Sequence, residues 1–424
     1  MENPKPDLPI DEIFRNFYAD DFGKYTDFEL LQFARGLVYY VIPEGKRQQY
    51  RVREIVGIGG ESVCVLAHDL WVRREVILKI GRLAVGNRVS LENRAIQESK
   101  ARWLRAGKIM HALSETVDRR FGIFNRVYSS YLYPPVYELE YIRGLHPLDF
   151  VKGRDFPTVF RFFYRLTVVL KIVHDLGILH RDIKTSNIIV VPRRLSFLPA
   201  IIDFTMSVPR SKELGASTFH TVVNPRFCSE LYASPLMRYD PSAATEMDDV
   251  FSLLRVLWVI IVGFEPDNPV VRPGAPIIPR CQAKAIKDKG IRRIYERGTS
   301  YDDNSYHTCE ELLEDLRRYA ESAKIDLSGV SAPTVSLEVK KKFLDSIEKE
   351  VGAETEVLDE PLGDALKTRK IRIDSSLTEE SRPPHVIVVP QGWAGEAMKN
   401  LFNFIVEIQK AERDGKEIVI KCDS

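Results

Sequence analysis

The residues best suited to chemistry lie in one octapeptide, His-Arg-Asp-Ile-Lys-Thr-Ser-Asn, at positions 180–187. Asp182 can accept the proton of an attacking hydroxyl, and Lys184 can neutralise charge that develops on a transferred phosphoryl group. Asn187 offers an amide oxygen to Mg²⁺. An acid, a basic residue and an amide in this order are the groups that phosphoryl transfer to a hydroxyl requires.

The octapeptide matches the H-R-D-x-x-x-x-N catalytic loop at its four fixed positions, so the chain resembles the eukaryotic-like Ser/Thr protein kinases. The alternative is a chance match in a surface loop, which the motifs upstream disfavour. The resemblance implies transfer of the γ-phosphoryl group of ATP to protein hydroxyls, with Asp182 as catalytic base. Lys184 favours Ser/Thr over Tyr specificity, because the tyrosine enzymes of this family usually lack a lysine there.

A glycine-rich turn, Gly57-Ile-Gly59-Gly60-Glu-Ser62-Val-Cys64, lies between two strand-like runs. Glycines let backbone N–H groups approach phosphate oxygens closely. The turn resembles the kinase G-x-G-x-x-G-x-V loop, with Ser62 for the third glycine and Cys64 for the valine. An ordinary hairpin is an equally good interpretation of the turn alone. A Rossmann turn is excluded because a strand pattern follows, not a helix.

Lys79 ends the apolar run Val76-Ile-Leu-Lys, which resembles the V-A-I-K strand of the family. A lysine within an apolar strand needs a partner for its charge. The resemblance implies that the partners of the Lys79 charge are the ATP α/β-phosphates and a helix glutamate. Glu98 is our candidate for this glutamate, and Glu92 is the alternative. It also places Leu139 behind the adenine and assigns the backbone groups of Glu140 and Ile142 to the adenine edge.

Asp203 follows an apolar strand in Ile201-Ile-Asp-Phe-Thr, which resembles the D-F-G motif that holds Mg²⁺. With Asn187 it would supply oxygen ligands, which Mg²⁺ prefers. Thr205 stands where the family has glycine. Because threonine adopts a positive φ only at a cost, we expect a peptide flip of this segment to be harder than in the family.

Residues 204–229 correspond to the activation segment of the family. Arg181 would pair with a phosphate on one of its hydroxyls, for which Thr218 and Thr221 are the candidates. The segment would end at a degraded A-P-E box, Cys228-Ser-Glu230, with Asn224 replacing or displacing the substrate-facing threonine.

Two later residues support the alignment with the family. Asp249 resembles the helix-start aspartate that braces the catalytic loop, and Arg297 stands where an arginine pairs with the box glutamate, Glu230.

Composition narrows the class of protein. The 61 basic and 60 acidic residues nearly cancel, which argues against nucleic acid or a membrane as a main partner. The five scattered cysteines have no metal-ligand spacing, and the N-terminus has no apolar signal segment. We therefore expect a cytoplasmic protein that uses ATP and Mg²⁺ and acts on a protein substrate.

The pattern of elements predicts an α+β chain with a two-lobed, protein-kinase-like fold and a small additional C-terminal α/β region. We expect a helical N-terminal extension over 1–49, a strand-rich lobe over 50–143, a helical lobe over 144–325 and an extension over 326–424. The extension carries a predicted parallel β-α-β unit of strand 385–390, helix 394–413 and strand 417–421. It is the candidate for docking a partner.

Two other functions remain open at this stage. Ser62, Thr205 and the altered A-P-E box also suit a catalytically idle kinase-like scaffold that binds a partner protein. A small-molecule phosphotransferase of the same fold is disfavoured, since such enzymes usually lack the Lys184 pattern and the activation segment.

Overall fold

The structure is a computed structural model that describes residues 26–42, 49–58, 62–81, 94–132, 135–194, 196–210, 229, 231–264, 280–330, 334–355, 372–373, 386–389 and 419–422. The chain forms two compact units, Met1–Lys349 and Glu350–Ser424.

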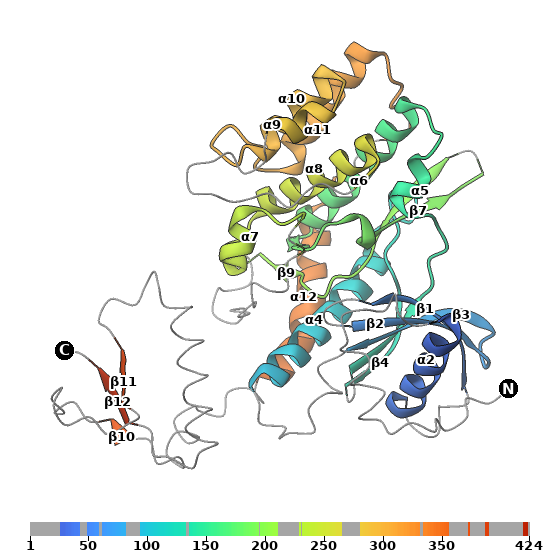
Figure 1. Ribbon diagram of the computed structural model, residues 1–424, viewed down its shortest axis with the longest axis vertical. Coiled ribbons are helices and arrows are strands. Elements are labelled where there is room, and N and C mark those ends of the chain that lie inside the picture. Colours follow the sequence, from blue (N-terminus) through green and yellow to red (C-terminus); the bar gives the residue numbers. More distant parts are fainter. Residues whose placement is uncertain are drawn as a thin grey trace. The chain divides into compact units, whose positions relative to one another are not determined.

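The first unit begins with a five-stranded antiparallel sheet in the order β1-β2-β3-β5-β4 (Figure 1). Its strands are β1 (Tyr50–Ile58), β2 (Ser62–Asp69), β3 (Arg74–Gly81), β4 (Val127–Leu132) and β5 (Pro135–Glu140). The register sets Lys79 of β3 opposite Cys64 of β2 and Tyr137 of β5. The sequence pattern of residues 72–80 predicts a third strand that starts at Val72. It starts at Arg74 because the Asp69 carboxylate accepts the N–H groups of Trp71 and Val72 and holds a turn there.

Two helices lie beside this sheet. α2 (Asp27–Val41) begins with the predicted capping box of Thr26 and Glu29, and its apolar face shares one core with β1, β2 and β3. α4 (Arg94–Thr116) runs twelve residues past the expected end at Leu104. The extension is stable because its apolar side chains remain buried, among them Ile109, Met110 and Leu113.

The rest of the first unit is mainly helical. Its helices are α5 (Pro147–Val151), α6 (Phe156–Asp175), α7 (Pro235–Tyr239), α8 (Glu246–Val262), α9 (Arg280–Ala285), α10 (Lys289–Thr299) and α11 (Cys309–Ala323). Two short strand pairs join them, β6 (Ile178–Leu179) with β9 (Val208–Pro209) and β7 (Ile188–Pro192) with β8 (Phe197–Ile201). Figure 1 shows the sheet at one end of this unit and the helices at the other. The two-lobed α+β fold expected from the sequence is confirmed.

The apolar run Leu253–Phe264 falls largely within α8, whose side chains from Asp248 to Ile260 are buried in the helical lobe. Within the part of the chain that the structure describes, no helix combines the length and apolar character needed to cross a membrane.

The second unit contains a parallel sheet of β10 (Arg372–Ile373), β12 (Val419–Cys422) and β11 (Val386–Val389), with β12 in the centre. The two strands of the predicted β-α-β unit therefore pair in parallel. The helix expected between them lies outside the described residues, so the complete unit stays a prediction. α12 (Leu337–Thr355) contains the division between the units, whereas the sequence placed the start of the extension at residue 326.

Candidate active site

The octapeptide at 180–187 is held by a buried carboxylate from α8. Asp249 Oδ2 accepts the N–H of His180 at 2.7 Å, and its Oδ1 accepts the N–H of Arg181 at 2.7 Å. Its Oδ2 also accepts from Nε2 of His174, on α6, at 3.0 Å. Burial raises the pKa of Asp249, but the hydrogen bond and charge of His174 outweigh it and lower the pKa. The predicted bracing contact of Asp249 is confirmed, and it supports the positive φ of Arg181.

The octapeptide brings its three chemical groups together. Lys184 Nζ lies 2.7 Å from Asp182 Oδ2. Asn187 Nδ2 donates to Asp182 Oδ2 at 2.9 Å and to the Asp182 carbonyl at 2.8 Å. Because both bonds use the amide nitrogen of Asn187, its amide oxygen remains for another partner. The side chains of a base, a cation and an oxygen donor thus share one small site.

A fourth member of this group, Ser229, was missed by the sequence analysis. Its Oγ donates to Asp182 Oδ1 at 2.8 Å and accepts from Lys184 Nζ at 2.9 Å. The sequence places Ser229 inside a degraded A-P-E box, with Asn224, outside the described residues, replacing or displacing the substrate-facing threonine. In the structure Ser229 closes a ring with Asp182 and Lys184, a contact that the sequence did not indicate.

A local signal for Ser229 does exist. Tyr232, three residues later, places its phenolic oxygen 2.9 Å from Thr185 Oγ1, so this segment is fixed against the octapeptide. The helix after it, α7, begins at Pro235 and is capped by Ser234. Serine followed by tyrosine and a Ser-Pro helix start is the sequence pattern that marks this segment.

Asp203 joins the site from the end of β8. The pairing of β7 with β8 continues in a bond from the Ile202 N–H to the Asn187 carbonyl at 2.9 Å, which brings Asp203 to the same end of the hairpin as Asn187. Asp203 has a φ of 65°. Lys79 Nζ, from the sheet of the other lobe, lies 2.5 Å from Asp203 Oδ1. The two lobes thus each contribute one member of a charge pair.

The surroundings of Asp203 keep it ionised. Burial alone would raise its pKa, but the charge of Lys79 and hydrogen bonds from Lys79 and Thr205 lower the pKa well below its ordinary value. A carboxylate and an amide oxygen are hard ligands that suit Mg²⁺ when phosphate oxygens complete its shell. Among the described residues, no group of three His, Cys, Asp or Glu side chains can hold a metal on its own. The carboxylate of Asp203 and the amide oxygen of Asn187 fit Mg²⁺ as two of its ligands.

Phe204 anchors the segment that carries Asp203. Its ring is fully buried and packs edge-on against His180, with ring centroids 4.7 Å apart, and against Phe124 at 5.8 Å. His180 belongs to the octapeptide, so the aromatic contact joins the segment that carries Asp203 to the segment that carries Asn187.

The glutamate predicted to pair with Lys79 lies among side chains that the structure does not describe. Glu98 lies in α4, but its side chain is outside the described residues, as is Glu92. Trp103 of α4 faces Lys79, whose Nζ lies 5.6 Å from the centre of the indole ring. Trp103 stacks on Tyr137 of β5 with ring centroids 4.7 Å apart. The pairing of Lys79 with Glu98 stays a prediction.

The segment predicted to receive adenine follows β5. The Glu140 N–H donates to the Arg126 carbonyl at 2.8 Å, and the Glu140 carbonyl accepts from Asn125 Nδ2 at 2.9 Å. That carbonyl keeps one lone pair for a further donor. The backbone of Ile142 makes no hydrogen bond to another described residue, and the Leu139 side chain is buried.

The glycine turn is described only at its ends. Gly57 pairs with Cys64 at an irregularity in the β1–β2 register, while Gly59 and Gly60 lie outside the described residues. A Cβ on Gly57 would meet Cys64 Cβ at an ordinary 3.8 Å, so protein packing does not require glycine here. Burial raises the pKa of the Cys64 thiol to about 11, so this thiol stays protonated near neutral pH.

The segment that follows Asp203 passes a set of arginines. Arg105 of α4 donates from Nε to the Ser207 carbonyl at 3.2 Å. Burial and the charges of Arg181 and Arg102 lower the pKa of Arg105 to about 10, which still leaves it charged near neutral pH. Thr218 and Thr221 lie outside the described residues, so their pairing with Arg181 stays a prediction.

Arg297 has a partner other than the predicted one. Its Nη1 lies 2.8 Å from Asp315 Oδ2, and its guanidinium stacks over Tyr306. Glu230 lies outside the described residues, so a pair between Arg297 and Glu230 stays a prediction.

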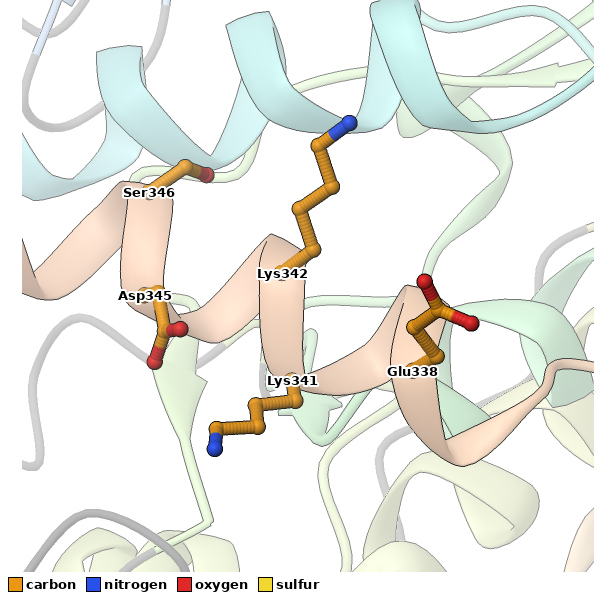
Figure 2. Close-up of a pocket in the computed structure, with 5 residues that line it drawn as sticks. All are labelled: Glu338, Lys341, Lys342, Asp345 and Ser346. Carbon is orange, nitrogen blue, oxygen red and sulfur yellow. The ribbon is translucent and has the colours of Figure 1, made fainter.

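Two surface pockets lie away from these groups. One, of about 400 Å³, borders α12 and is lined by Glu338, Lys341, Lys342, Asp345 and Ser346 (Figure 2). Figure 2 shows Lys342 extending toward α4, whereas Lys341 points away from it. The other, of about 640 Å³, lies between α6, α11 and the segment after α11. None of the described site residues lines either pocket.

The chain is similar to curated protein kinases. It is 24% identical over 303 residues to a probable serine/threonine-protein kinase of Clostridium perfringens. The matched region covers 67% of this chain and 40% of that protein. It is 26% identical over 302 residues to the serine/threonine-protein kinase PknB of Mycolicibacterium smegmatis. This match covers 68% of this chain and 45% of PknB. It is 27% identical over 235 residues to the ovarian-specific serine/threonine-protein kinase Lok of Drosophila melanogaster. This match covers 53% of this chain and 46% of Lok.

These similarities support a protein kinase family for the chain, which spans less than half the length of these relatives. No family model matches it.

Proposed function

We propose that this chain is a protein serine/threonine kinase that uses ATP and Mg²⁺. The observation that carries the proposal is the convergence of four side chains from distant parts of the sequence. Lys79 of β3 pairs with Asp203, and Asn187 pairs with Asp182. The Phe204–His180 contact joins the segment of Asp203 to that of Asp182 and Asn187. The similarity to serine/threonine kinases over about two thirds of the chain supports the same function.

The proposed roles follow from these contacts. Asp182 orients the substrate hydroxyl and accepts its proton, while Lys184 stabilises charge on the transferred group. Lys79 holds the nucleotide phosphates, and the oxygens of Asn187 and Asp203 are the protein ligands of the ion. Bound Mg²⁺ would supply charge neutralisation at the phosphates. Ile142 and the Glu140 carbonyl would receive the adenine edge.

The substrate would be a protein hydroxyl. Ser229 supports this, because its hydroxyl fixes Asp182 and Lys184 relative to each other at the place where an acceptor would arrive. A phosphate on Thr218 or Thr221 would bring charge to Arg181 and its neighbour Arg105 and order the activation segment. The second unit is proposed to dock a partner or substrate.

A catalytically idle scaffold is the second candidate. It is favoured by one observation, the direct bond of Thr205 to both Lys79 and Asp203, which occupies two groups that nucleotide binding requires. Against it, Lys79, Asp182, Asn187 and Asp203 are all present, and idle relatives commonly lack one of them.

Incubation of the full chain with Mg²⁺-ATP and generic protein acceptors, followed by mapping of phosphorylated residues, tests the proposal. Phosphoserine or phosphothreonine in the acceptors supports it. Nucleotide binding without transfer would instead identify the scaffold, and transfer only to a sugar, amine or alcohol would identify a small-molecule phosphotransferase.

A further inference from the structure

Thr205 has a contact that its position in the sequence does not reveal. Its Oγ1 donates to Asp203 Oδ1 at 2.5 Å and accepts from Lys79 Nζ at 2.8 Å. The side chain is only 6% exposed, so water competes little for these bonds. In the D-F-G motif that residues 203–205 resemble, the third position is glycine, which has no hydroxyl. Thr205 therefore adds a polar group between the two charged residues that connect the lobes.

The donors around Asp203 all converge on one of its oxygens. Oδ1 accepts from Lys79 Nζ at 2.5 Å, from Thr205 Oγ1 at 2.5 Å and from the Thr205 N–H at 3.2 Å. No described residue donates to Oδ2. Three donors on one side of a carboxylate fix its rotation about the Cβ–Cγ bond, because any turn would break bonds to a charged acceptor.

We propose that Thr205 is a positioning residue that dedicates Oδ1 of Asp203 to Lys79 and leaves Oδ2 for the metal ion of a Mg²⁺-nucleotide. This inference rests on the proposed function, since it assigns a role within the same site. Asp203 itself has a φ of 65°, a conformation that costs energy for a residue with a side chain, so its orientation depends on contacts of this kind.

The backbone effect of Thr205 and the effect of its hydroxyl can be separated. Thr205→Val keeps the branched Cβ and its conformational restriction but removes the hydroxyl. Thr205→Ser keeps the hydroxyl and removes the branch. If Thr205 acts only by stiffening the backbone, valine substitutes for it and serine does not. If it acts through Oγ1, the order is reversed.

The test measures the affinity of the full chain for a non-hydrolysable ATP analogue by calorimetry, once with Mg²⁺ and once with EDTA. For Thr205→Val we expect the gain in affinity that Mg²⁺ provides to fall about tenfold or more, with little change in EDTA. Thr205→Ser should retain the gain. Thr205→Ala, which also lacks the hydroxyl, replaces the valine variant if thermal melting shows that variant to be unfolded.

Two results would overturn the inference alone. One is an unchanged Mg²⁺-dependent gain in Thr205→Val, and the other is an equal loss of affinity with and without Mg²⁺, which would mean a general structural role. A wild-type chain that binds no nucleotide under either condition would overturn the proposed function as well.

Discussion

At the scale of single residues, the site depends on hydroxyl and carboxylate groups that hold one another in place. Asp182 is held by Asn187, Lys184 and Ser229, and Asp203 by Lys79 and Thr205. Each charged group has its partner within 3 Å, so the geometry exists before any substrate binds. Pre-formed contacts of this kind reduce the reorganisation that a reaction would otherwise require.

Removing the hydroxyl of Ser229 tests its contribution to this geometry. Ser229→Ala should lower kcat for protein phosphorylation about tenfold, because two hydrogen bonds to charged groups are lost. ATP affinity should change little, since Ser229 contacts no residue assigned to the nucleotide. Ser229→Thr is the matched control and should retain most of the rate. Equal rates for the alanine and wild-type proteins would contradict the role of Ser229.

The His174–Asp249 pair predicts a pH dependence of stability. Burial opposes the charged form of His174, but Cys309 and Asp249 favour it and raise the pKa to about 9. Charged His174 therefore stabilises the fold fully below the unfolded pKa of about 6.5, and this contribution is lost as the pH rises toward 9. Urea unfolding of wild type and His174→Asn from pH 6 to 9.5 should show the difference between them shrinking with pH. A difference that grows with pH would contradict the assignment.

The contacts within the octapeptide and the contacts of Ser229 and Thr205 differ in one respect. Asp182, Lys184 and Asn187 lie within six positions, so their mutual contacts follow from one short loop. Ser229 contacts Asp182 across 47 residues, and Thr205 contacts Lys79 across 126. Spacing in a sequence carries little information on contacts of that range, because tertiary packing decides them.

At the scale of elements, α4 and α8 determine where the site residues lie. α8 carries Asp249, which fixes the backbone of the octapeptide, and α4 lies beside the sheet that carries Lys79. The close approach of α4 to β5 depends on Gly107, whose N–H donates to the Tyr137 hydroxyl at 3.2 Å. A helix glycine is normally a weakness, so its presence here has a packing reason.

Gly107→Ala tests that packing. Alanine should stabilise a free helix by about 1 kcal/mol, but its Cβ would lie 2.8 Å from Tyr137 Cε1, too close for the ring to stay in place. We expect a net loss of about 1–3 kcal/mol in the free energy of unfolding.

Replacing the ring gives the control for this prediction. In a Tyr137→Leu background, Gly107→Ala should be neutral or stabilising in urea unfolding. If Gly107→Ala stabilises the wild-type background, the proposed contact between α4 and β5 is wrong.

The elements themselves were largely predictable. The five strands and the main helices follow from alternation, helical periodicity and caps such as Thr26 with Glu29. The differences have local causes that periodicity does not contain. The Asp69 turn delays β3, and α4 continues because the surrounding lobe buries its apolar residues up to Leu113.

At the scale of the whole molecule, the two compact units suggest separate functions, catalysis in the first and docking in the second. All described site residues lie in the first unit, and the second contains the small parallel sheet around β12. An extra domain commonly gives a generic catalytic core its choice of substrate, which motivates the docking role proposed for the second unit.

Deleting residues 356–424 tests this division while keeping α12 whole. We expect the truncated chain to unfold like the first unit of the full chain and to phosphorylate generic acceptors at a similar rate. Its preference among protein substrates, measured by phosphosite mapping on a mixed protein extract, should broaden or shift. Unchanged preference and unchanged complex formation would rule out the docking role.

The central claim is that Asp182 performs chemistry within a nucleotide site built by Lys79, Asn187 and Asp203. It is tested most directly by measuring ATP binding and phosphate transfer on the same samples of wild type and Asp182→Asn, with Asp118→Asn, an exposed carboxylate, as control. We predict that Asp182→Asn binds Mg²⁺-ATP like wild type and loses at least about a hundredfold in transfer to serine or threonine. Transfer that persists undiminished in Asp182→Asn would contradict the account.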